Sequence, residues 1–174
     1  MNYCELKNFD VANGPGVRVS LFVSGCTHHC EGCFQPETWD FNYGKPFTEE
    51  TIEEIIEYLK LDYIKGITLL GGDPLEKSNQ GPLLKLLRRI REEFGETKDV
   101  WCFTGYEFEK DIIGYMMDEW EDTKELMSYI DILVDGEFEL AKKDLMLKFK
   151  GSSNQKTIKV KESLASNKII LWDE

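Results

Sequence analysis

The segment Val17-Arg-Val-Ser-Leu-Phe-Val23 is followed almost at once by Gly25-Cys26-Thr27-His28-His29-Cys30-Glu31-Gly32-Cys33-Phe34. The first part is rich in β-branched and aromatic residues, which predicts a strand. Three residues separate Cys26 from Cys30, and two separate Cys30 from Cys33. With this spacing, one short loop after a strand can wrap a metal centre with three thiolates.

Three thiolates do not complete the usual ligand set of an iron–sulfur cluster, which is held by four cysteines. On a four-iron cluster they would leave one iron without a protein ligand, and an open metal position is typical of a catalytic site. Two other interpretations remain open at this point. His28 or His29 could complete a Cys3His zinc site, or the cysteines could be reduced loop thiols.

Three further apolar segments have strand character, and each ends in a polar turn. Residues 66–70 precede Gly71-Gly72-Asp73-Pro74, residues 99–103 precede Thr104-Gly105-Tyr106, and residues 130–134 precede Asp135-Gly136. Later strands are expected at 157–160 and 168–172. Because ligand sites in parallel α/β sheets lie at the carboxyl ends of the strands, we expect these turns and the cysteine loop to surround one mouth.

Helical patterns separate these strands. Thr48 is placed as an N-cap before an apolar stripe, and Pro82 suits the first turn of a helix that Gly95 ends. Residues 108–129 are helical in pattern, with a break expected near Gly114 or Asp122. The alternation of strands and helices predicts an α/β fold with a mostly parallel sheet.

Composition narrows the functional classes. The chain has 174 residues, 21 Lys and Arg against 33 Asp and Glu, and a net charge of −12. A general nucleic-acid or anionic-membrane binder would need a positive surface. The length favours a single domain over 1–174, and the absence of a secretory signal at the start favours a cytoplasmic protein. The odd count of five cysteines argues against a disulfide framework, and Cys4 and Cys102 are expected to be structural thiols.

The pattern Cys-x3-Cys-x2-Cys after a first strand, followed by the aromatic Phe34, resembles the radical S-adenosylmethionine (SAM) superfamily. Asn13-Gly14-Pro15-Gly16-Val17-Arg18 is similar to the Asp-Gly-Pro-Gly-x-Arg signature of glycyl-radical-enzyme activases, with Asn in the first position. Gly71-Gly72-Asp73-Pro74 resembles the Gly-Gly-Glu/Asp-Pro element of that superfamily. The order and spacing of motifs from residue 13 to 160 resemble the activases of anaerobic ribonucleoside-triphosphate reductases.

The resemblance implies a fold and a chemistry. The fold would be an incomplete βα barrel of about five or six strands, since a full barrel takes ~250 residues. A 4Fe-4S cluster on Cys26, Cys30 and Cys33 would bind SAM and cleave it to a 5′-deoxyadenosyl radical. That radical would take a hydrogen from a glycine in the large subunit of the reductase. A low-potential donor such as flavodoxin would supply the electron.

The resemblance also implies roles for individual residues. The adenine of SAM would lie beside Gly32, Cys33 and Phe34, and its methionine amine at Gly71, Gly72 and Asp73. Thr104, Gly105 and Asp135 would line the rest of the cofactor site, and Glu137 stands where related activases have the second position of an Asp-x-Lys pair. The expected partner contacts are Asn13, Gly14, Pro15, Gly16 and Arg18, the last touching either the reductase or the SAM carboxylate.

Three alternatives to this function remain. The chain could activate a different glycyl radical enzyme, or it could be a radical SAM enzyme that acts on a small molecule. An alternative of another class is a binding module stabilised by zinc on the three cysteines and one histidine.

Overall fold

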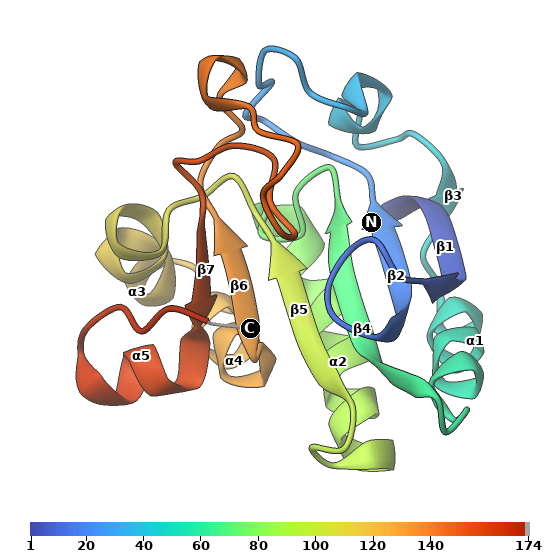
Figure 1. Cartoon of the computed structure of the whole chain (residues 1–174). Helices are drawn as coiled ribbons and strands as arrows, with labels where there is room; N and C mark the ends of the chain where they lie inside the picture. The colour runs from blue at the N-terminus through green and yellow to red at the C-terminus, as the bar shows by residue number, and fades with distance from the viewer. Residues whose placement is uncertain (173–174) are drawn as a thin grey trace.

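The computed structural model describes residues 1–172, and its centre is a sheet of seven strands in the order β3-β1-β2-β4-β5-β6-β7 (Figure 1). The four inner strands β2, β4, β5 and β6 are parallel to one another, while β1, β3 and β7 pair antiparallel with their neighbours. The strands are β1 Asn2–Asp10, β2 Val17–Val23, β3 Lys45–Pro46, β4 Ile64–Gly71, β5 Asp99–Phe103, β6 Ile132–Asp135 and β7 Lys156–Lys159.

The mixed α/β class and the parallel centre are confirmed, but the expected strand count of five or six is wrong. Most side chains of β1 are exposed or half-buried, so its sequence carries no clear apolar alternation. β3 has only two residues. The pairing of these edge strands depends on contacts distant in the sequence, which a local pattern does not report.

The C-terminal part also differs from expectation. β7 replaces the strand expected at 157–160 and is antiparallel to β6, because the helical turn at 140–142 between the two strands has three residues, too few to carry a parallel crossover. Residues 168–172 form no strand: Leu171 makes a single bridge to Ile158. α5, Val160–Ser166, is followed by its C-cap Asn167, which has a left-handed backbone.

Helices and helical turns connect the strands. They are η1 Pro36–Trp39, α1 Glu49–Leu59, α2 Lys77–Phe94, the π-helix η2 Phe108–Met116, α3 Met117–Glu119, α4 Thr123–Tyr129, η3 Leu140–Lys142 and α5 Val160–Ser166. Within the described residues, no helix combines the length and the apolar character needed to cross a membrane. The break expected near Asp122 is confirmed, whereas the helical turns continue through Gly114.

The start predicted for α2 is wrong. The helix begins at Lys77, so Pro82 lies inside it. The earlier start is held by the buried side chain of Asn79, whose Nδ2 donates to the carbonyl oxygens of Ser24 at 3.1 Å and Asp73 at 2.9 Å. These bonds fix the first turn of α2 to the ends of β2 and β4, which is where the cysteine loop begins.

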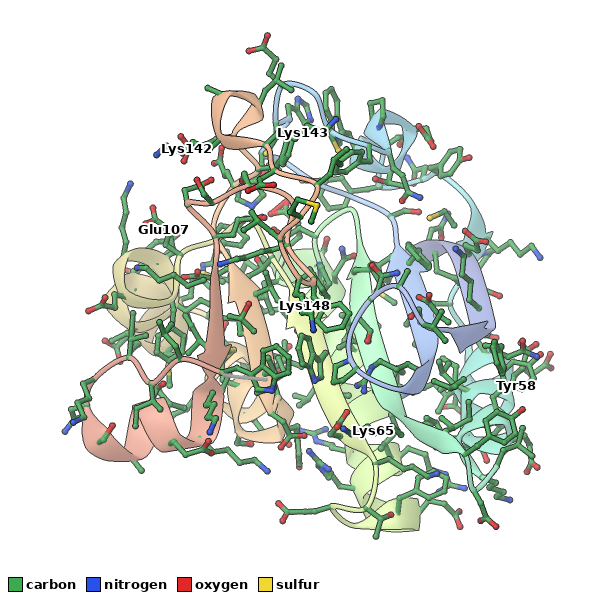
Figure 2. All side chains as sticks on the ribbon, in the orientation of Figure 1. Tyr58, Lys65, Glu107, Lys142, Lys143 and Lys148 are labelled. Carbon is green, nitrogen blue, oxygen red and sulfur yellow. The ribbon has the colours of Figure 1, made fainter. Side chains whose placement is uncertain are left out.

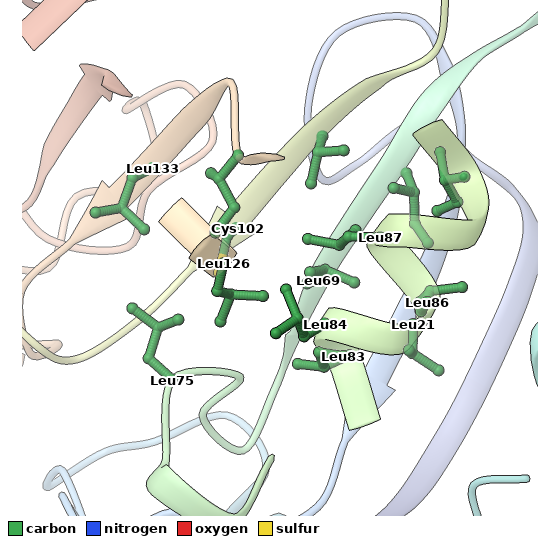
Figure 3. Packing of buried hydrophobic residues seen from close by; sticks show 14 of the residues in the cluster. Leu21, Leu69, Leu75, Leu83, Leu84, Leu86, Leu87, Cys102, Leu126 and Leu133 are labelled. Atoms are coloured by element: carbon green, nitrogen blue, oxygen red, sulfur yellow. The ribbon is translucent and has the colours of Figure 1, made fainter. Parts of the chain in front are cut away.

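The two faces of the sheet have different roles. Side chains alternate along each strand, and one set, including Val19, Leu21, Leu69 and Cys102, packs with α1, α2 and α4 in the main core. Figure 3 shows Cys102 among the core leucines, as expected of a structural thiol. The other face carries Trp101 in a smaller cluster and is crossed by loops. A ligand can therefore approach the sheet only from this second face.

The N-cap of α1 provides a test of the fold. The Thr48 side chain accepts from the Thr51 backbone N–H, and the Thr51 hydroxyl accepts from the Thr48 N–H. Thr48→Ala removes one acceptor and should lower the free energy of unfolding by about 1 kcal/mol, measured by urea denaturation. Thr48→Ser keeps the hydroxyl and is the control. Equal stability of the Ala and Ser variants would contradict this role of the cap.

Candidate functional site

The loops that follow β2, β4, β5 and β6 meet at the carboxyl ends of the parallel strands, as the sequence predicts (Figure 1). Between them lies a cavity of about 500 Å³. Its wall includes Cys26, Cys30 and Cys33 from the first loop, Gly71 and Gly72 from the second, Thr104 and Gly105 from the third, and Gly136 from the fourth. Four loops that are distant in the sequence therefore form one site.

The cysteine loop places all three thiols on this cavity, and none of them is in a disulfide. Cys26 is buried, while Cys30 and Cys33 are half-buried. The Cys33 N–H donates to the Cys30 carbonyl at 3.1 Å, which closes a tight turn. Gly32 has a φ of 77°, a left-handed angle that glycine tolerates. Three free thiols facing one space are a donor set that fits an iron–sulfur cluster.

Burial and nearby carboxylates disfavour the thiolate forms of Cys26 and Cys30. Burial raises the pKa of Cys26 to about 12, and the nearby Asp73 carboxylate adds to this effect. Burial also raises the pKa of Cys30, with a further contribution from Glu137. The protein alone therefore keeps the thiols of Cys26 and Cys30 protonated. A positively charged metal centre is the group that would convert them to thiolates.

His28 joins two loops rather than facing the cavity as a free ligand. Its Nε2 lies 2.8 Å from Asp73 Oδ2 and its Nδ1 3.2 Å from Glu137 Oε1. Burial opposes protonation, but the hydrogen bonds and charges of Asp73 and Glu137 outweigh it and raise the pKa of His28 to about 9. Both ring nitrogens therefore have carboxylate partners, and His28 connects the cysteine loop to the loops after β4 and β6.

The geometry argues against the zinc alternative. Since His28 has no free nitrogen, only His29 could serve as the fourth ligand, and its ring stacks on Trp39 with centroids 4.4 Å apart. Over residues 1–172, no three His, Cys, Asp or Glu side chains lie close enough together to hold a single ion.

Asp73 is saturated with hydrogen bonds from the protein. Its carboxylate accepts from the Thr104 hydroxyl at 2.8 Å and from the N–H groups of Gly105 and Leu75, each at 2.9 Å, in addition to its contact with His28. A carboxylate offers about four lone-pair positions. In this structure the Asp73 side chain joins loops, and the expectation that it accepts from the SAM ammonium stays a prediction.

The two glycines before Asp73 are required by the packing of the chain itself. Gly71 has a φ of 110°, and a Cβ there would lie 2.5 Å from the Val23 nitrogen. A Cβ on Gly72 would lie 2.5 Å from the Gly25 carbonyl oxygen. The Gly72 N–H donates to the Val23 carbonyl at 2.7 Å. Any larger residue would push the end of β4 away from the cysteine loop.

Asp135 lies beneath the cavity rather than in its wall. Its carboxylate accepts from the N–H groups of Phe108 at 2.8 Å and Lys156 at 3.2 Å. Burial raises its pKa. Both oxygens are held by backbone donors at the starts of η2 and β7, and the expected direct contact with the cofactor stays a prediction. Gly136, the next residue, lines the cavity instead.

Arg18 is fully buried, and its expected contact with the reductase or with the SAM carboxylate stays a prediction. Its guanidinium donates to Thr68 Oγ1 at 2.8 Å, to the Pro15 carbonyl at 3.1 Å and to the Asp99 carboxylate. Thr68 in turn donates to the Asn13 carbonyl at 2.7 Å. Arg18 thus fastens the loop before β2 onto the sheet, and this loop places Asn13 in the cavity wall.

Phe34 is at the outer edge of the site. Its side chain is exposed, with its ring 5.3 Å from that of Phe138 and 5.4 Å from Lys143 Nζ. A Cβ on Gly32 would lie 2.9 Å from Leu140. The segment after β6 therefore lies against the cysteine loop.

Sequence reasoning missed Glu76 and the role of Tyr106. Glu76 is buried and accepts from the Thr27 N–H at 2.7 Å and from the Tyr106 hydroxyl. It fixes the residue next to Cys26 to the loop after β5. The only signal was its place, two residues beyond the Gly-Gly-Asp-Pro turn.

Comparison with known proteins gives a consistent result. Residues 12–158 match the family described as a 4Fe-4S single cluster domain. Anaerobic ribonucleoside-triphosphate reductase-activating proteins from several sources are similar over most of their length. The protein of phage T4 is 41% identical over 160 residues, covering 90% of this chain and 92% of its own. That of Escherichia coli K12 is 43% identical over 157 residues, covering 89% and 96%.

A third relative, from Vibrio cholerae, has the same name and is 41% identical over 158 residues, covering 89% of this chain and 96% of its own. The matched region contains all four loops of the cavity. The chain belongs to the 4Fe-4S single cluster domain family and to the family of anaerobic ribonucleoside-triphosphate reductase-activating proteins.

Proposed function

We propose that the chain is a radical SAM enzyme that forms the glycyl radical of an anaerobic ribonucleoside-triphosphate reductase. One observation carries the proposal: three free thiols face a single cavity of about 500 Å³ at the carboxyl ends of four parallel strands. That volume lies in the range of sites for small molecules and cofactors. The names of the relatives supply the reductase as the substrate.

The chemistry comes from the cofactors. When bound, a reduced 4Fe-4S cluster supplies the electron that splits SAM into methionine and a 5′-deoxyadenosyl radical, which takes a hydrogen atom from a glycine Cα of the reductase. The protein binds and orients the cofactors, and it excludes water from them. Cys26, Cys30 and Cys33 would hold the cluster, and with three protein thiolates one iron would stay free to bind the amine and carboxylate of SAM.

The cavity wall supports this orientation. The backbone of Gly71 and Gly72 borders the cavity and is proposed to accept from the SAM amine, since the Asp73 side chain is occupied. Gly32, Cys33 and Phe34 are proposed to flank the adenine. Thr104 and Gly105 are held in the wall by Asp73.

The fold fits an incomplete barrel in this proposal. The helices of the main core cover one face of the sheet, while the cavity opens on the other face, where a polypeptide can enter. Asn13 lines the cavity, and the loop of Asn13, Gly14, Pro15 and Gly16 remains the proposed partner contact. We further propose one domain over 1–174, a cytoplasmic location, and a donor such as flavodoxin.

Anaerobic reconstitution tests the proposal. The parent chain should bind about four irons, cleave SAM under reducing conditions, and produce a glycyl-radical EPR doublet in the reductase. Cys33→Ser should lose the cluster and the doublet. Cys4→Ser is the control, because Cys4 lies outside the cavity and donates only to the Phe22 carbonyl.

Other outcomes separate the alternatives. A colourless protein that retains one zinc would support the binding module. SAM cleavage without a doublet would point to another glycyl radical enzyme or to a small-molecule substrate. Either outcome would contradict the proposed function.

Asp73 supports a second prediction. Asp73→Ala leaves the Thr104 hydroxyl, two N–H groups and His28 without their acceptor. We expect a loss of about 2–4 kcal/mol in the free energy of unfolding and a lower iron content after reconstitution. Glu31→Ala removes the same charge from an exposed position on the cysteine loop and should change neither quantity. Wild-type iron content in Asp73→Ala would refute the loop-joining role.

A further inference from the structure

Residues 140–150 form a segment between β6 and β7 that we call the basic flap. It contains Lys142, Lys143, Lys148 and Lys150 against a single acid, Asp144, which gives a net charge of +3. The whole chain carries a net charge of −12. The flap is therefore a positive region on an otherwise strongly negative protein, and such a local contrast selects partners of opposite charge.

The flap also exposes apolar side chains. Leu145 is 84% and Met146 is 88% exposed, the highest values among the large exposed hydrophobic residues of the described chain. A pair of adjacent exposed apolar residues surrounded by charge is typical of a protein interaction surface.

The flap borders the cavity and the cysteine loop. Asp144, Leu145 and Leu147 line the cavity, and Lys143 Nζ lies 5.4 Å from the centre of the Phe34 ring. Figure 2 labels Lys142 and Lys143 close together near the top of the molecule. Val11, 63% exposed, precedes the cavity-lining residues Ala12 and Asn13 in another loop. Exposed apolar residues therefore come from two separate loops that both reach the cavity.

We propose that the basic flap, together with Val11, is the docking surface for an acidic polypeptide segment of the reductase, the segment that delivers the glycine into the cavity. This inference rests on the proposed function and adds to it the recognition surface and the charge of its partner.

The continuity of the surface favours the polypeptide substrate over the electron donor. Leu145 is exposed at the rim and also lines the cavity, so a partner that covers the flap meets the interior directly. A substrate glycine must enter that space. An electron donor needs only to approach the cluster from outside. A docking surface that leads into the cavity would therefore not help an electron donor to bind.

Two side chains of the flap allow a clean test. Lys142 and Met146 do not line the cavity, and the double variant Lys142→Glu/Met146→Ser reverses a charge and removes an apolar contact. Lys142 pairs with Glu139, three residues earlier, at 3.5 Å. Lys110 pairs in the same way with Glu107 at 3.9 Å, and the nearby Ile113 is 45% exposed. Lys110→Glu/Ile113→Ser on η2 is therefore the matched control.

The measurement is the Kd of each reconstituted chain for the reductase, taken anaerobically at low and high salt. The flap variant should bind about tenfold more weakly and lose most of the salt dependence of the parent, while the η2 variant stays within about twofold of the parent. Iron content and circular dichroism of each variant check that the cluster and the fold are intact.

The remaining outcomes are decisive. A flap variant that binds the reductase like the parent would overturn the inference. So would a variant that loses only flavodoxin-driven activation while dithionite-driven activation persists, or one that changes only self-association in sedimentation. A parent that neither binds nor activates the reductase would contradict the proposed function itself, and the inference with it.

Discussion

The carboxylate of Asp73 connects the loops on which the cavity depends. It lies just after β4 and accepts from the Thr104 hydroxyl and the Gly105 N–H after β5, and it contacts His28 of the cysteine loop. The other nitrogen of His28 contacts Glu137 after β6. One buried carboxylate and one imidazole thus join the ends of four parallel strands. Without them, the cysteine loop would lose its side-chain contacts with Asp73 and Glu137.

The parallel sheet explains why these loops meet at all. Parallel strands place their carboxyl ends at one edge, and the helices packed on one face leave the other free. Buried polar groups then fasten the loops on the free face: Arg18 holds the loop that ends at β2, Asn79 fixes the start of α2, and Glu76 holds Thr27. Each is fully buried or nearly so and hydrogen-bonded, as a polar group in a protein interior must be.

The sequence predicts the parts of the fold that depend on local pattern. The boundaries of β2 and β5, the Thr48 cap and the apolar stripe of α1 follow from strand alternation, capping chemistry and helical periodicity. The edge strands β1 and β3 and the direction of β7 depend on long-range pairing. The local pattern at 168–172 suggested a strand, but these residues make only one bridge.

In the candidate site, too, some features follow from the local sequence and others depend on contacts between distant residues. The spacing of the cysteines and the positions of the turns predict which residues meet, and the cavity contains most of them. The sequence does not show which carboxylate oxygens and guanidinium N–H groups already have hydrogen-bond partners in the fold. Asp73, Asp135 and Arg18 each look available as isolated residue types, yet each is occupied by groups distant in the chain.

The central claim is that three cysteines leave one iron of the cluster open for SAM. Pulsed ENDOR spectroscopy of the reduced, reconstituted protein with SAM labelled by ¹⁵N at its amino group tests it directly. We expect a hyperfine coupling between the cluster and the labelled nitrogen. A coupling to a histidine nitrogen of the protein instead, with none to the label, would contradict it.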